Sequence, residues 1–110
     1  MIEVELQIHV RRNGEPFLTS ATVKLLQEVQ RCGSLRIAAK GLHYSYQHAW
    51  DLVNEINRVA SEPVVIKQRG GAGGGGAQLS VHGRRLLGEY NNIERLIKTF
   101  TKKLNAEMNF

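Results

Sequence analysis

The glycine-rich segment at residues 70–76 is the first stretch of this chain that could do chemistry. Six of its seven residues are glycine, and Gly71, Gly73 and Gly76 match the G-x-G-x-x-G spacing of dinucleotide-binding turns. Such a site needs a helix that starts at the last glycine, within a parallel strand–helix–strand unit. Here a short strand pattern follows, and Ala77 and Gln78 stand where a P-loop has Lys and Ser or Thr. We therefore expect no nucleotide site.

The histidines and the single cysteine do not predict catalysis or metal binding. His9, His43, His48 and His82 lack the spacing of metal ligands, such as i and i+4 on one helix with a third ligand. Cys32 lies on the apolar stripe of a predicted helix, which indicates a core position. No Ser/His/Asp arrangement has a recognisable elbow. We therefore expect no enzyme activity, no metal and no cofactor.

Polar side chains share one face of the helix predicted from Ser45 to about Ala60. Their types match DNA recognition, because Gln, Asn and Arg form paired hydrogen bonds with adenine and guanine edges. An ordinary solvated face is the alternative interpretation. The polar face consists of Gln47, Asp51, Asn54 and Arg58, and the opposite apolar face of Ala49, Leu52, Val53, Ile56 and Ala60.

The start of this helix adds further candidate DNA contacts. Ser45, Tyr46 and His48 can donate to phosphates or bases, as the first residues of recognition helices do. Asp51 would repel phosphate, so we expect it to accept from a cytosine amino group or to orient an arginine. Trp50 lies between the two faces, and we expect it to pack the helix against its neighbours.

The elements around this helix predict a winged helix-turn-helix. Thr19 or Ser20 can cap a helix that runs to about Cys32, and Gly33 follows it. Ser34 can cap a short second helix that ends at Gly41. Strand patterns at 64–69 and 77–80 flank the glycine segment and predict a wing. A disordered linker is the alternative for the glycines, but it does not explain the apolar strand before them and the long helix after them.

The N-terminal segment predicts a strand and a hairpin. Residues 2–11 alternate strictly between apolar and polar side chains, which is typical of a half-buried strand. Asn13 and Gly14 favour a two-residue hairpin turn, because both tolerate positive φ. Pro16 limits the return strand to an edge or a short stub.

The C-terminal part, residues 81–104, predicts a long helix that forms a homodimer. Its apolar residues are spaced 4, 3, 4, 3 and 4 apart, as in a coiled-coil seam. A helix with a second apolar face could serve the core and a subunit partner together. The seam consists of Leu86, Tyr90, Ile93, Ile97, Phe100 and Leu104.

Charge and composition favour a nucleic-acid partner and exclude several classes of protein. The chain has 110 residues and a net charge of +5, and the whole excess lies between residues 31 and 88, where eight basic side chains face three acidic ones. The longest apolar runs are three residues, so we expect no membrane span and no signal peptide. One cysteine suits a reducing compartment, and we expect a cytoplasmic protein.

Several of these motifs together resemble the N-terminal domain of the ModE family, the bacterial molybdate-responsive transcriptional regulators. The resemblance covers about residues 19–104. It rests on the S-Y-x-x-A-W-D pattern from Ser45 to Asp51, on the segment 54–57, on the glycine run at 70–77 and on Leu79, Ser80 and Gly83. It implies a winged helix-turn-helix related to the LysR-type DNA-binding domain, acting as a dimer on inverted-repeat operators.

Two departures from the family pattern change what we expect. Sensing members carry C-terminal oxyanion-binding domains, which these 110 residues do not contain, so we expect no molybdate binding by this chain. Many relatives have a basic residue within the wing, where this chain has Ala72, so wing contacts would fall to Lys67, Arg69 and backbone N–H groups.

The sequence thus predicts one domain over residues 1–110, mainly α with a small antiparallel β-sheet. We expect a DNA-binding transcriptional regulator, and a winged helix that holds a protein partner is the alternative function. The expected DNA contacts are Ser34, Arg36, Ser45, Tyr46, Gln47, His48, Asp51, Asn54, Arg58, Lys67 and Arg69.

Overall fold

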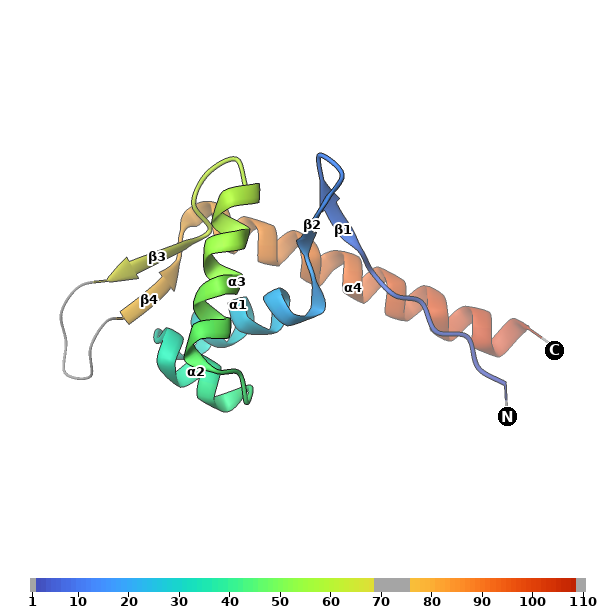
Figure 1. Ribbon diagram of the computed structural model, residues 1–110. Helices are drawn as coiled ribbons and strands as arrows, with labels where there is room; N and C mark the ends of the chain where they lie inside the picture. Colours follow the sequence, from blue (N-terminus) through green and yellow to red (C-terminus); the bar gives the residue numbers. More distant parts are fainter. Residues whose placement is uncertain (1, 69–75, 109–110) are drawn as a thin grey trace.

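The computed structural model describes residues 2–68 and 76–108, and its elements follow the expected order (Figure 1). The helices are α1 (Ser20–Cys32), α2 (Leu35–Gly41), α3 (Tyr46–Val59) and α4 (Val81–Glu107). The strands are β1 (Val10–Arg12), β2 (Glu15–Leu18), β3 (Val65–Gln68) and β4 (Gly76–Leu79). They form two separate two-stranded antiparallel sheets, β1–β2 and β3–β4. The fold is therefore the predicted mainly helical winged helix-turn-helix, with two small sheets in place of one.

Hydroxyl side chains define where each helix begins. Thr19, Ser34, Ser45 and Ser80 are the N-caps, and each side-chain oxygen accepts from the backbone N–H three residues later. These bonds satisfy N–H groups that have no partner inside the helix. The predicted helix starts are confirmed, and α4 extends three residues beyond the predicted end at Leu104.

The two predicted glycine joints behave differently. Gly33 ends α1 with a left-handed φ of 69°, as expected. Gly41 is instead the last residue of α2, and the left-handed residue in the turn before α3 is His43, with φ 60°. The predicted helix end at Gly41 is confirmed, and Leu42 keeps a helical conformation before the chain reverses.

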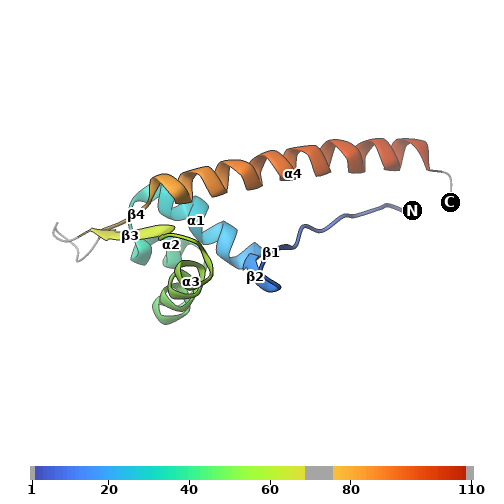
Figure 2. The same ribbon diagram turned by 90° about the horizontal axis from the view of Figure 1, so that it is seen from above.

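The predicted ten-residue N-terminal strand is mostly unpaired. β1 covers Val10–Arg12 alone, joined to β2 by the expected turn, in which Asn13 and Gly14 have φ of 52° and 80°. β2 ends at Leu18 because Thr19 caps α1, and among the residues that the structure describes no strand pairs with residues 2–9. This segment runs beside the C-terminal half of α4 (Figures 1 and 2). There the Asn105 side chain accepts from the N–H of Val4 at 2.6 Å and donates to its carbonyl at 3.0 Å.

The core forms around α1, which lies between α4 and the helix-turn-helix (Figure 2). This arrangement places α3 and α4 on opposite sides of the body, so their outer faces are available to different partners. The largest fully buried side chains are Leu25, Leu26, Val29, Val64 and Leu87.

The base of the wing is joined to the turn between α1 and α2 by a backbone hydrogen bond. Ala77 of β4 donates to the carbonyl of Gly33 at 3.2 Å, in the turn between α1 and α2. The Ser80 hydroxyl donates to the carbonyl of Pro63 at 2.6 Å and so links the segment before β3 to the residue after β4. Gly83 lies so close to the residue before β3 that a Cβ there would clash with the carbonyl oxygen of Val64.

Two glycines of α4 provide a matched test of this packing. We expect Gly83→Ala to lower the free energy of unfolding by about 1–3 kcal/mol, because the helix must move away from Val64. Gly88→Ala is the control, since a Cβ there has no atom within 4 Å and should stabilise the helix by about 0.5–1 kcal/mol. Urea denaturation measures both. Equal effects of the two substitutions would contradict the close contact.

Candidate nucleic-acid interface

The two faces of α3 have the burial that the sequence predicts. Ala49, Val53 and Ile56 are buried against the other helices. Gln47, Asp51, Asn54 and Arg58 are all exposed. The apolar residues therefore fix the rotation of the helix about its axis, and this rotation directs the polar face outward.

The first turn of α3 combines capping with aromatic contacts. The Ser45 hydroxyl accepts from the N–H of His48 at 3.0 Å, and Ser34 caps α2 in the same way through Ile37 at 3.1 Å. The His48 ring packs edge-on against Tyr44, with ring centroids 5.1 Å apart. The hydroxyls of both serines can still donate, so capping leaves them available to a phosphate.

A row of cations and aromatic rings crosses the surface from α2 to β3. The Arg36 guanidinium lies 4.4 Å from the centroid of the Tyr46 ring, and the Lys67 ammonium lies 3.9 Å from that of Trp50. The two rings meet edge-on with centroids 6.1 Å apart. Each exposed cation–π contact contributes about 0.5–1 kcal/mol and orients its cation. The row thus places one exposed cation on each side of the first turns of α3. Trp50 packs against its neighbours as expected.

A groove of about 420 Å³ lies between α3 and the base of the wing. Gln47 and Asn54 line it from the helix, and Lys67 lines it from β3. Amide groups and a cation therefore share one hollow of the surface. This combination suits base edges and the neighbouring phosphates. Arg69, the other expected wing contact, lies outside the described residues.

Asp51 interacts with Gln47 one turn earlier in α3. The Gln47 Nε2 donates to Asp51 Oδ1 at 2.9 Å. Within residues 2–68 and 76–108, no arginine or lysine nitrogen lies within 4.0 Å of the Asp51 carboxylate. The expectation that Asp51 orients an arginine is therefore replaced by a contact with a glutamine.

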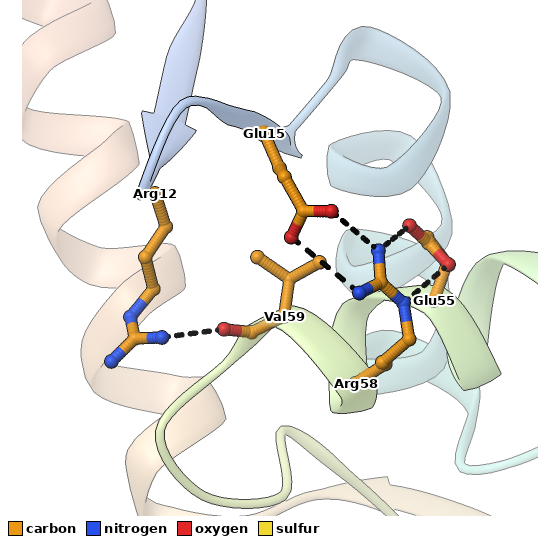
Figure 3. A network of polar contacts seen from close by, with 5 residues as sticks. All are labelled: Arg12, Glu15, Glu55, Arg58 and Val59. Atoms are coloured by element: carbon orange, nitrogen blue, oxygen red, sulfur yellow. Dashed lines mark hydrogen bonds and ion pairs between the residues drawn. The ribbon is translucent and has the colours of Figure 1, made fainter.

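Arg58 belongs to an ion-pair network at the other end of α3 (Figure 3). Its guanidinium bonds to Glu55 at 2.6 Å and to Glu15 of β2 at 3.1 Å. The hydrogen bond from Arg58 lowers the pKa of Glu55, and the two carboxylates raise the pKa of Arg58. Nearby, Arg12 donates to the carbonyl of Val59 at 2.7 Å (Figure 3). In this arrangement Arg58 joins α3 to the N-terminal hairpin, so a DNA contact would have to compete with two carboxylates.

The side chain of Asn57 has a role that sequence reasoning did not identify. Its Oδ1 accepts from the N–H groups of Val64 at 2.8 Å and Val65 at 3.2 Å, and its Nδ2 donates to the carbonyl of Val65 at 3.1 Å. These bonds hold the start of β3 against α3. An asparagine on the flank of a helix seven residues before a strand was the available signal.

The predicted dimer seam of α4 divides between the core and the surface. Tyr90 is buried in the chain's own core, where burial and the nearby Glu94 raise the pKa of its hydroxyl, and Leu86 packs against the same core. Ile97 and Leu104 are half-buried. The exposed apolar side chains are Ile93, Phe100 and, beside the seam, Leu96, with exposed fractions of 39%, 53% and 65%.

Two other classes of site are absent from the described ranges. Across residues 2–68 and 76–108, no three histidine, cysteine or acidic side chains gather where they could hold a metal ion. The same ranges contain no helix with the length and apolar character to cross a bilayer.

Comparison with known proteins gives relatives that are named ModE and MopB. The chain is 35% identical over 95 residues to the transcriptional regulator ModE of Haemophilus influenzae, which covers 86% of the chain and 37% of the regulator. It is 36% identical over 92 residues to the molybdenum transport protein ModE of Azotobacter vinelandii, covering 84% and 34%. It is 39% identical over 89 residues to the molybdenum-pterin-binding protein MopB of Rhodobacter capsulatus, covering 77% and 33%. The chain spans about a third of the length of these relatives. No protein-family model matches it.

Two asparagines of α3 allow the structural and the candidate binding roles to be separated. We expect Asn57→Ala to lower the free energy of unfolding by about 1–3 kcal/mol, because it leaves the buried N–H of Val64 without its partner. Asn54→Ala changes an exposed side chain in the same helix and should stay within about 0.5 kcal/mol. Thermal denaturation of both variants measures these effects. If Asn57→Ala is as stable as the wild type, the hydrogen bonds of Asn57 to Val64 and Val65 are not needed to hold β3 against α3.

Proposed function

Because this chain belongs to the ModE family of transcriptional regulators, we propose that it is a sequence-specific DNA-binding regulator that acts through α3. The observation that carries the proposal is the exposed polar face of α3, whose amides share a groove with Lys67. The relatives named as transcriptional regulators support a function in binding and regulation, not in catalysis.

In the proposed complex α3 lies in the major groove. Its N-terminal residues approach the base edges, as in other helix-turn-helix proteins. Gln47 and Asn54 are the expected base contacts, because amides pair with base edges. Lys67 and Arg36 lie at opposite ends of the row of cations and rings, where their charges can neutralise flanking phosphates. We propose further phosphate contacts from Ser34, Ser45, Tyr46 and His48, and from Arg69, which lies outside the described residues.

We also propose that two copies of the chain associate through α4. Ile93, Leu96 and Phe100 are apolar and exposed on a helix that lies across the body from α3. Burying them against a second copy would remove this surface from water and leave both α3 helices free. A symmetric dimer matches inverted-repeat operators, since each half-site then meets the same surface.

The names of the relatives support a link to molybdenum. We propose that the regulated genes concern molybdenum and that these 110 residues themselves bind no molybdate. Isothermal titration of the chain with molybdate should give no saturable heat. Saturable binding of one oxyanion per chain would contradict this proposal.

Base contacts and phosphate contacts should fail differently when they are removed. We expect Gln47→Ala to cost about 1–3 kcal/mol on the preferred duplex and little on a scrambled one. We expect Lys67→Ala to weaken both duplexes equally and to reduce the slope of log K against log salt by about 0.9. Lys103→Ala, an exposed lysine of α4, is the charge-matched control.

Fluorescence anisotropy on both duplexes at several salt concentrations measures these effects. If Gln47→Ala and Lys67→Ala lose the same fraction on both duplexes, α3 does not lie in the groove as proposed. If the wild type shows no salt-dependent duplex binding, the alternative of a winged helix that holds a protein partner is favoured.

The dimer is tested with charges on the exposed face of α4. We expect Ile93→Glu and Phe100→Glu to produce monomers, because a carboxylate would be buried between two apolar surfaces. Val81→Glu is the control, since Val81 is also exposed but lies at the first turn of the same helix. Sedimentation velocity at micromolar concentration measures whether each variant is a monomer or a dimer. A monomeric wild type would refute the dimer.

A further inference from the structure

The hydrogen bond between Gln47 and Asp51 determines which atoms of the Gln47 amide remain free. Gln47 is the second residue of α3, and Asp51 lies one turn later on the same face. A carboxylate oxygen accepts hydrogen bonds but cannot donate them, so the atom of Gln47 that faces Asp51 must be the nitrogen. Asp51 therefore fixes the orientation of the amide.

The free atoms that remain form a defined pattern. Asp51 uses one N–H of Gln47. When this is the N–H trans to the carbonyl oxygen, the N–H on the same side as the oxygen stays free, and the two form a donor beside an acceptor. In the major groove adenine presents an acceptor, N7, beside a donor, the N6 amino group. Guanine presents two acceptors, which would leave the carbonyl oxygen of Gln47 without a partner.

We propose that Asp51 is a positioning residue that holds Gln47 ready to recognise an adenine. The inference rests on the proposed function, because it assumes that α3 enters the major groove. It also explains why an anion lies on a surface that faces phosphates. The repulsion between Asp51 and DNA lowers affinity for every sequence, whereas the fixed amide improves discrimination at one base pair. Without Asp51 the glutamine side chain would lose more rotamer freedom when it binds.

The experiment compares four variants on duplexes that differ at single base pairs. The preferred site of the wild type is first obtained by selection from random duplex DNA. We then measure Gln47→Ala, Asp51→Ala, Asp51→Asn and the double variant Gln47→Ala/Asp51→Ala. Asn91→Ala, an exposed amide on α4, is the control. All of these side chains are exposed, and circular dichroism checks that each variant is folded.

We expect Gln47→Ala to remove a preference of about 5- to 150-fold for A·T at one position of each half-site. Asp51→Ala should lower the same preference about two- to fivefold. Asp51→Asn should retain it, because the amide oxygen of Asn still accepts from Gln47. Both Asp51 variants should bind scrambled DNA more tightly, since both remove the negative charge. In the double variant the effect of Asp51→Ala on preference should vanish.

Three results would overturn the inference and leave the proposed function standing. The first is that Asp51→Ala leaves the preference at every position unchanged. The second is that it still changes a preference when Gln47 is already alanine, which would mean that Asp51 contacts a base itself. The third is that Gln47→Ala changes a preference for guanine or cytosine. If the wild type binds no duplex in the selection, the proposed function itself fails.

Discussion

The hydrogen bonds of Asn57, which join the end of α3 to the start of β3, are the constraint on which the rest of the surface depends. Asn57 binds the backbone of Val64 and Val65, and Val64 is completely buried under Gly83 of α4. A side chain at Gly83 would push α4 away from this strand. Because β3 is held on both sides, Lys67 is placed over Trp50 and next to the amides of α3.

Short contacts, more than the total charge, decide which cations on this surface stay available. Arg36 and Lys67 are held over aromatic rings and stay exposed, whereas Arg58 is engaged by two carboxylates at the far end of α3. A net charge of +5 therefore describes the available cations poorly. The end of α3 near α2 and the wing is the part where cations remain available, and it is also the part where the amide of Gln47 is oriented.

The apolar stripe of α4 is wider than the core requires. Tyr90 and Leu87 close the core, whereas Ile93 and Phe100 lie along the same helix in contact with water. The N-terminal segment covers part of the remaining length through Val4 and Asn105. Because α4 lies opposite α3, a dimer formed through α4 would leave the outer face of α3 uncovered.

Local physical chemistry was enough to predict the order and type of the elements from the sequence. Hydroxyl caps and apolar periodicity identified the helices of the described residues, Asn13 and Gly14 identified the hairpin, and the helical spacing of polar residues in α3 identified its polar face. These features depend on residues close together in the chain. The length of the N-terminal strand depended on pairing with another strand, and within residues 2–68 and 76–108 no strand pairs with residues 2–9. Likewise, only the tertiary structure decided that Arg58 pairs with Glu15 and that Lys67 lies over Trp50, because these contacts join segments separated in the sequence.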